Sequence, residues 1–218
     1  MNAIEIKNLT KIIRKKRVLY NVDAVFEGGN IYGLYGRNGC GKTMLLRAIS
    51  GLIYPTEGHI IIDGKILHKE MDFPEDIGII IENVELLAQY DAYTNLKLLA
   101  DIKGKIGEAE IKSIMEKLGL DSDSKKKVGS FSLGMKQKLA IAQAMMENPQ
   151  ILLLDEPTNG LDEESVDMVR KLLLEAKERG AVILLASHNK EDLNILADYI
   201  VKMKDGTIES IQKGGIQC

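Results

Sequence analysis

The sequence has no long apolar run and no apolar segment near its start. The longest uninterrupted apolar run, Ala181–Ala186, is far shorter than the roughly 20 residues that a membrane-spanning helix needs. The first residues, MNAIEIKNLTK, contain no apolar signal-peptide core. We therefore expect neither a secretory leader nor a membrane span, and any role at a membrane would come through a partner.

Cysteine and excess positive charge are also scarce. Two cysteines, Cys40 and Cys218, form no disulfide framework, so we expect a cytoplasmic location. Lys and Arg total 29 against 32 Asp and Glu, a net charge of −3, so no nucleic-acid partner is expected. The 218 residues are 45% apolar and 28% charged, which is the range of a soluble globular protein.

The apolar pattern predicts strands that alternate with helices, which is typical of an α/β fold with a mainly parallel sheet. Before this sheet the pattern predicts antiparallel strands, joined at Arg14–Arg17 by a solvated basic turn. Helical spacing dominates from about residue 84 to residue 148, which predicts an inserted helical subdomain. We expect a single domain, 1–218, with an α/β core formed by 1–83 and 149–218 and a helical subdomain formed by 84–148.

A glycine-rich segment lies between a predicted strand, 31–35, and a predicted helix, 44–50. It reads Gly36-Arg37-Asn38-Gly39-Cys40-Gly41-Lys42-Thr43 and fits the phosphate-loop pattern G-x-x-x-x-G-K-[ST]. Glycines let the backbone N–H groups wrap around phosphate oxygens. Lys42 would reach the β- and γ-phosphates, and the Thr43 hydroxyl would ligate Mg²⁺. The motif predicts a P-loop NTPase. Because Cys40 lies in this loop beside Lys42, we also expect a reactive thiol.

Two adjacent carboxylates, Asp155 and Glu156, end the apolar strand 151–155. Ligands bind at the carboxyl edge of a parallel sheet. Asp155 can hold Mg²⁺ there, and Glu156 can polarise an attacking water. An ordinary helix cap is the alternative reading of two acidic residues after a strand.

Three further motifs follow in a fixed order. The segment 131–137, FSLGMKQ, precedes a predicted helix, Asp162 ends the segment NGLD, and His188 ends ASH after a strand. Together with the phosphate loop and the paired carboxylates, these motifs resemble those of ABC-type ATPases: the signature (commonly LSGGQ), the D-loop and the switch histidine. The resemblance covers essentially the whole chain.

The resemblance implies that the chain binds ATP and Mg²⁺ and hydrolyses ATP. It implies that two copies, identical or paralogous, sandwich two nucleotides head to tail. Ser132, Gly134 and Asp162 would then act at the ATP of the other copy, and His188 would contact the γ-phosphate. It also implies a separate transmembrane permease, which would hold the chain at the cytoplasmic face of the membrane.

The sequence departs from the family pattern at several positions. Leu133 and Met135 replace the usual Gly and Gln of the signature, and this form is similar to export ATPases of the bacitracin and lantibiotic type. Glu82 stands where the Mg²⁺-binding glutamine of the Q-loop is expected, and Ile13 stands where an aromatic usually stacks on adenine. We expect Glu82 to ligate Mg²⁺ and Ile13 to give the base only apolar contact.

The leading hypothesis is the ATP-hydrolysing subunit of an ABC exporter. The alternatives are a soluble ABC ATPase that acts as a clamp on nucleic acid or ribosomes, and the ATPase subunit of an importer. A P-loop kinase fits poorly because the signature segment is present.

Overall fold

The structure is a computed structural model that describes residues 3–82 and 84–214; Cys218 lies outside them. The strands are β1 (Ala3–Ile13), β2 (Lys16–Glu27), β3 (Asn30–Tyr35), β4 (Glu57–Ile62), β5 (Lys65–Ile66), β6 (Ile77–Ile80), β7 (Ile151–Asp155), β8 (Val182–Ala186), β9 (Tyr199–Lys204) and β10 (Thr207–Lys213). The helices are α1 (Lys42–Ile49), α2 (Ala92–Lys103), α3 (Glu108–Lys117), the 3-10 helix η1 (Val128–Ser130), α4 (Leu133–Met145), α5 (Glu163–Glu178) and α6 (Lys190–Leu196).

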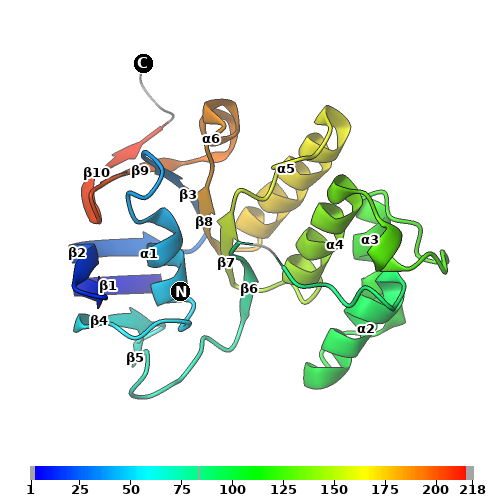
Figure 1. The fold of residues 1–218 in the computed structure, drawn as a ribbon, viewed down its shortest axis with the longest axis horizontal. Helices are drawn as coiled ribbons and strands as arrows, with labels where there is room; N and C mark the ends of the chain where they lie inside the picture. The colour runs from blue at the N-terminus through cyan, green and yellow to red at the C-terminus, as the bar shows by residue number, and fades with distance from the viewer. Residues whose placement is uncertain (1–2, 83, 215–218) are drawn as a thin grey trace.

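Within the described residues the strands form two sheets. A four-stranded antiparallel sheet has the order β2-β1-β4-β5. A six-stranded sheet has the order β10-β9-β3-β8-β7-β6, and in it only β10 runs antiparallel to its neighbour. The antiparallel sheet and α1 lie at one end of the molecule, and α2, α3 and α4 lie at the other (Figure 1). The predicted fold class is therefore confirmed.

The central strands β3, β8 and β7 of the six-stranded sheet are buried on both faces, as their apolar runs predict. Alternate residues of β8 show the division. Leu184 and Ala186 pack in a cluster with α1 and the antiparallel sheet, whereas Ile183 and Leu185 pack in a cluster with α2 to α6. Helix α1, which follows β3 in the chain, thus packs against one face of the sheet.

Helices α2, α3 and α4 gather beside the edge strand β6 (Figure 1). The contact is close, because a Cβ added to Gly78 of β6 would lie 1.9 Å from the Ala144 carbonyl oxygen of α4. Asp91 caps α2 by accepting a hydrogen bond from the Thr94 N–H at 2.8 Å. The limits of this helical region as a subdomain, 84–148, stay a prediction.

The local elements lie where the pattern places them, with ends shifted by a few residues. The predicted hairpin turn between β4 and β5 has left-handed φ angles of 49° at Asp63 and 81° at Gly64, as a tight hairpin turn requires. Among the residues that the structure describes, no helix combines the length and apolar character that a membrane crossing needs.

Candidate functional site

The register of the parallel strands brings three motifs to one edge of the sheet. Leu34 of β3 pairs with Ala186 of β8, which pairs with Asp155 of β7. The loop that starts at Gly36, the carboxylates at the end of β7 and the segment of His188 after β8 therefore leave the sheet at one level. This edge is where ligands bind in open parallel sheets.

The loop between β3 and α1 needs glycine for steric and conformational reasons. A Cβ at Gly36 would lie 2.3 Å from the Met203 carbonyl oxygen. Gly39 and Gly41 have left-handed φ angles of 76° and 113°. Gly41 precedes the first turn of α1, which is fully described and carries no acidic side chain. The N-terminus of this helix therefore presents its positive potential to an anion without an acidic side chain of its own.

The Lys42 side chain folds back over this loop and is only 7% exposed. Its Nζ donates to the carbonyl oxygens of Gly36 at 2.8 Å and Arg37 at 3.5 Å. A phosphate in the loop would offer the ammonium group charged acceptors, and charge-assisted hydrogen bonds are stronger than those to neutral carbonyls. Lys42 is therefore held where an entering phosphate would meet it.

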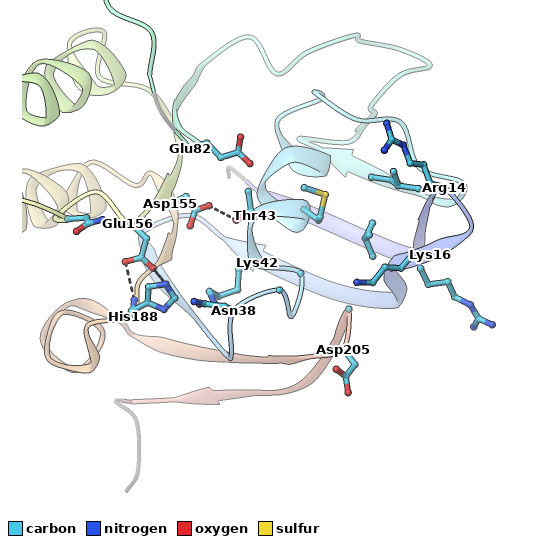
Figure 2. A pocket seen from close by; sticks show the side chains of 18 of the residues that line it. Arg14, Lys16, Asn38, Lys42, Thr43, Glu82, Asp155, Glu156, His188 and Asp205 are labelled. Atoms are coloured by element: carbon cyan, nitrogen blue, oxygen red, sulfur yellow. Dashed lines mark hydrogen bonds and ion pairs between the residues drawn. The ribbon is translucent and has the colours of Figure 1, made fainter. Parts of the chain in front are cut away.

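Two of the three predicted Mg²⁺ ligands touch each other. Thr43 Oγ1 donates to Asp155 Oδ2 at 2.5 Å, and such hard oxygen donors suit Mg²⁺. Glu82 lines the same cleft (Figure 2). Its Oε2 lies 2.5 Å from Arg47 Nη2 of α1. In residues 3–82 and 84–214 no three His, Cys, Asp or Glu side chains cluster as a metal site. The oxygen donors fit Mg²⁺, and the role of Glu82 stays a prediction.

Glu156 and His188 contact each other at one end of the cleft (Figure 2). The His188 N–H donates to Glu156 Oε2 at 3.1 Å, and His188 Nε2 lies 3.3 Å from Oε1. Burial raises the pKa of Glu156 above its ordinary value; the Asp155 charge adds to this, while His188 and Lys42 oppose it. Oε1 is buried and makes no hydrogen bond to any described group. A glutamate whose pKa is raised binds a proton more readily than an ordinary glutamate, which is the property that a general base needs.

A cleft of about 1110 Å³ joins these groups. The predicted residues that line it are Ile13, Asn38, Gly39, Gly41, Lys42, Thr43, Glu82, Asp155, Glu156 and His188. Gly36, Arg37 and Cys40 do not line it with their own atoms. The structure thus brings most of the predicted phosphate, metal and base residues into one hollow.

The basic turn between β1 and β2 also belongs to the cleft. Arg14, Lys16 and Arg17 line it beside Ile13 and Val18. The turn is exposed, as predicted, but its place at the cleft was missed. Lys16 and the labelled Arg14 lie at the far end of the cleft from His188 (Figure 2). The sequence did offer a signal for this place, because the basic run Arg14–Arg17 directly follows Ile13, which we expected to contact the nucleotide base.

The signature segment begins α4. Ser132 is the N-cap, and its hydroxyl accepts from the Met135 N–H at 3.2 Å. Leu133 is 72% exposed and lines the cleft, whereas Ser132 and Gly134 are not among the residues that line it. A Cβ at Gly134 would lie 3.3 Å from the Gly160 carbonyl oxygen. One chain therefore does not bring Ser132 into its own cleft.

Asp162 has a local structural task. It caps α5 by accepting from the Ser165 N–H at 2.9 Å. Hydrogen bonds from the side chain and backbone of Ser165 hold the pKa of Asp162 below its ordinary value. Asp162 does not line the described cleft. Its predicted role at a second nucleotide stays a prediction.

The expected reactive thiol at Cys40 is contradicted by its burial. Cys40 is only 6% exposed and packs in the apolar cluster around α1. Its N–H donates to the Arg37 carbonyl at 3.2 Å, and its carbonyl oxygen accepts from the Gly206 N–H at 2.9 Å. The small side chain fills space beneath the loop, which the sequence pattern alone could not show.

The glycine-rich loop with Lys42, the paired carboxylates and His188 meet in one cleft at the carboxyl edge of a parallel sheet, which is the arrangement of a P-loop nucleoside triphosphatase. The sequence model described as "ABC transporter" matches residues 19–159. The chain belongs to the ABC transporter family and is an ATPase of that family.

Similar proteins agree with this assignment. The chain is 54% identical over 210 residues to the uncharacterized ABC transporter ATP-binding protein YybJ of Bacillus subtilis, covering 96% of each. It is 37% identical to the lantibiotic transport ATP-binding protein SrtF of Streptococcus pyogenes, covering 94% of this chain and 88% of SrtF. A dimeric bacterial ABC transporter cassette superposes with a TM-score of 0.86 at 26% identity, covering 96% of this chain and 98% of that cassette.

Replacing Ile13 by tyrosine should tighten ATP binding. Ile13 is 38% exposed and lines the cleft, so a ring there has room to lie on a base. Stacking of an aromatic side chain on a base contributes about 1–3 kcal/mol in nucleic-acid systems. Titration with a fluorescent ATP analogue measures the gain, and Ile12→Tyr, on the neighbouring exposed residue, is the control. Equal affinity of the Ile13 variant and the wild type would show that another residue covers the base.

Proposed function

We propose that this chain is the ATP-hydrolysing subunit of an exporter and powers a separate transmembrane subunit. The observation that carries the proposal is that Lys42, Asp155 and Glu156 line one cleft beside the N-terminus of α1. The names of SrtF and of the bacitracin transport protein BcrA of Bacillus licheniformis, which is 38% identical and of which the chain covers 68%, support antibiotic-peptide export.

The residues of the cleft divide the reaction between them. Backbone N–H groups of the loop Gly36–Thr43 and the Lys42 ammonium group bind the triphosphate. Glu156 takes a proton from water while the water oxygen attacks the γ-phosphorus and the bond to the β-phosphate oxygen breaks, releasing ADP and phosphate. His188 orients that water and the γ-phosphate. Thr43, Asp155 and Glu82 would hold Mg²⁺, which supplies positive charge to the phosphates when bound.

A second copy of the chain, or a paralogue, would complete the site. Ser132 caps α4 at an exposed surface, so its hydroxyl and the helix N-terminus can meet the γ-phosphate held by another chain. Gly134 allows close approach there, and Asp162 would contact the same interface. The residues 84–148 then act as the subdomain that carries the signature to the partner.

The membrane subunit would contact a groove beside β6. The groove has a volume of about 210 Å³ and is lined by apolar residues of β6, α2 and α4. Ile102 of α2 is 77% exposed there, and Lys103 and Glu147 form an ion pair of 3.2 Å at its rim. An apolar floor with a charged rim fits an amphipathic helix. Such a contact would place the chain at the cytoplasmic face of the membrane.

Co-purification tests the partner. A tagged wild-type chain, isolated from detergent-solubilised membranes, should bring down one polytopic membrane protein. Ile102→Glu should lose it because a charge would be buried against the apolar floor. Ile195→Glu, an exposed position of α6 outside the groove, should retain it. Ribosomal proteins in place of a membrane protein would overturn the exporter proposal.

A further inference from the structure

A buried carboxylate joins the loop that carries Glu156 to the helix that follows His188. Asp192 of α6 is only 1% exposed. Its Oδ2 accepts from the Thr158 hydroxyl at 2.7 Å, and its Oδ1 accepts from Arg170 Nε at 3.0 Å and Nη2 at 2.6 Å. One carboxylate therefore holds three donors that come from two other segments.

Each partner lies on a segment that leads away from the site. Thr158 follows Glu156 in the loop between β7 and α5, and Asp192 follows His188 at the start of α6. The same two loops also meet at the cleft, where the His188 N–H donates to Glu156 Oε2. Two hydrogen bonds thus join these segments: His188 to Glu156 in the cleft, and Thr158 to Asp192 outside the cleft lining.

Stability alone is a weak reason for this arrangement. Burying an ion pair costs desolvation energy, and apolar replacements of such pairs are often equally stable. The arrangement does fix the orientation of the Asp192 carboxylate, because the planar guanidinium of Arg170 binds it well in only a narrow range of geometries. The Thr158 hydroxyl transfers that fixed position to the loop of Glu156.

We propose that Thr158 and Asp192 are positioning residues for ATP hydrolysis. They hold Glu156 and His188 in the relative placement that water activation needs, and neither lines the described cleft. The inference rests on the roles proposed above for Glu156 and His188. Loss of the Thr158 hydroxyl should therefore slow the chemical step and leave nucleotide binding unchanged.

Paired substitutions at Thr158 test this. Thr158→Val keeps the shape and removes the donor, while Thr158→Ser keeps the donor. A small misplacement of reacting groups can cost about 100-fold in rate. We expect kcat for ATP to fall by up to that factor in Thr158→Val, with KM and the affinity for ATP within about twofold of wild type. Thr158→Ser should restore kcat.

A matched control separates positioning from stability. Lys177 of α5 forms an ion pair of 2.5 Å with Asp198, at the other end of α6. Lys177→Gln removes an ion pair between α5 and the residues after α6 without touching the loop of Glu156, so its kcat should equal that of wild type even where urea unfolding shows a loss of stability.

Wild-type kcat in Thr158→Val, or an equal loss in Thr158→Ser, would overturn the inference, as would a rise in KM that matches the fall in kcat. Glu156→Gln distinguishes failure of the positioning role from failure of the proposed catalytic roles. If Glu156→Gln is inactive while Thr158→Val turns over normally, only the positioning role fails. If Glu156→Gln itself turns over normally, the proposed catalytic roles fail too.

Discussion

Glu156→Gln is expected to reduce ATP hydrolysis by about 100- to 10,000-fold, the range that a general base contributes. Glutamine has the size of glutamate but cannot take a proton from water. The substitution also removes a negative charge from a cleft that must hold the γ-phosphate. ATP should therefore still bind and should hold two chains together as a dimer. Phosphate release measures the first effect, and size-exclusion chromatography with ATP measures the second.

Glu116→Gln is the control for this substitution, since Glu116 is an exposed residue of α3 outside the cleft. The pH profile gives a further check. Burial raises the pKa of Glu156, and the base works only when ionised. The rate should therefore decline on the acid side at a higher pH than an ordinary glutamate, of pKa about 4.3, would allow. Wild-type turnover in Glu156→Gln would falsify the role of Glu156.

The sequence predicted the frame of the site because the frame depends on local rules. Strand β7 is a short apolar run, and its end places Asp155 and Glu156 at the sheet edge whatever surrounds them. The positions of Gly39 and Gly41 follow from backbone conformations that glycine adopts most readily. The helix predicted after the segment 131–137 is present as α4, and Ser132 is its N-cap.

The parts that were missed depend on contacts between distant residues. Cys40 is buried because the turn around Gly206 packs on the loop, and no local pattern reports that contact. Glu82 is paired with Arg47, which lies on α1. The hydrogen bond between Thr158 and Asp192 joins the loop after β7 to α6. Tertiary packing decides all three, so spacing along the chain could not predict them.

Lys42→Met should have the opposite signature to Glu156→Gln, because it should weaken binding itself. A hydrogen bond to a charged group contributes about 1.5–3 kcal/mol, which corresponds to a loss of ATP affinity of about 10- to 100-fold. Methionine keeps much of the length of the buried side chain, so the loop loses the ammonium group more than its packing.

The matched control is Lys171→Met, which removes a charge from an exposed position of α5 outside the cleft. Isothermal titration with ATP, in the absence of turnover, compares both variants with wild type. If Lys42→Met bound ATP as tightly as Lys171→Met, the ammonium group would not contact the phosphates. The loss of affinity in Lys42→Met and its retention in Glu156→Gln would together separate the group that binds the triphosphate from the group that activates water, although both lie on the same cleft.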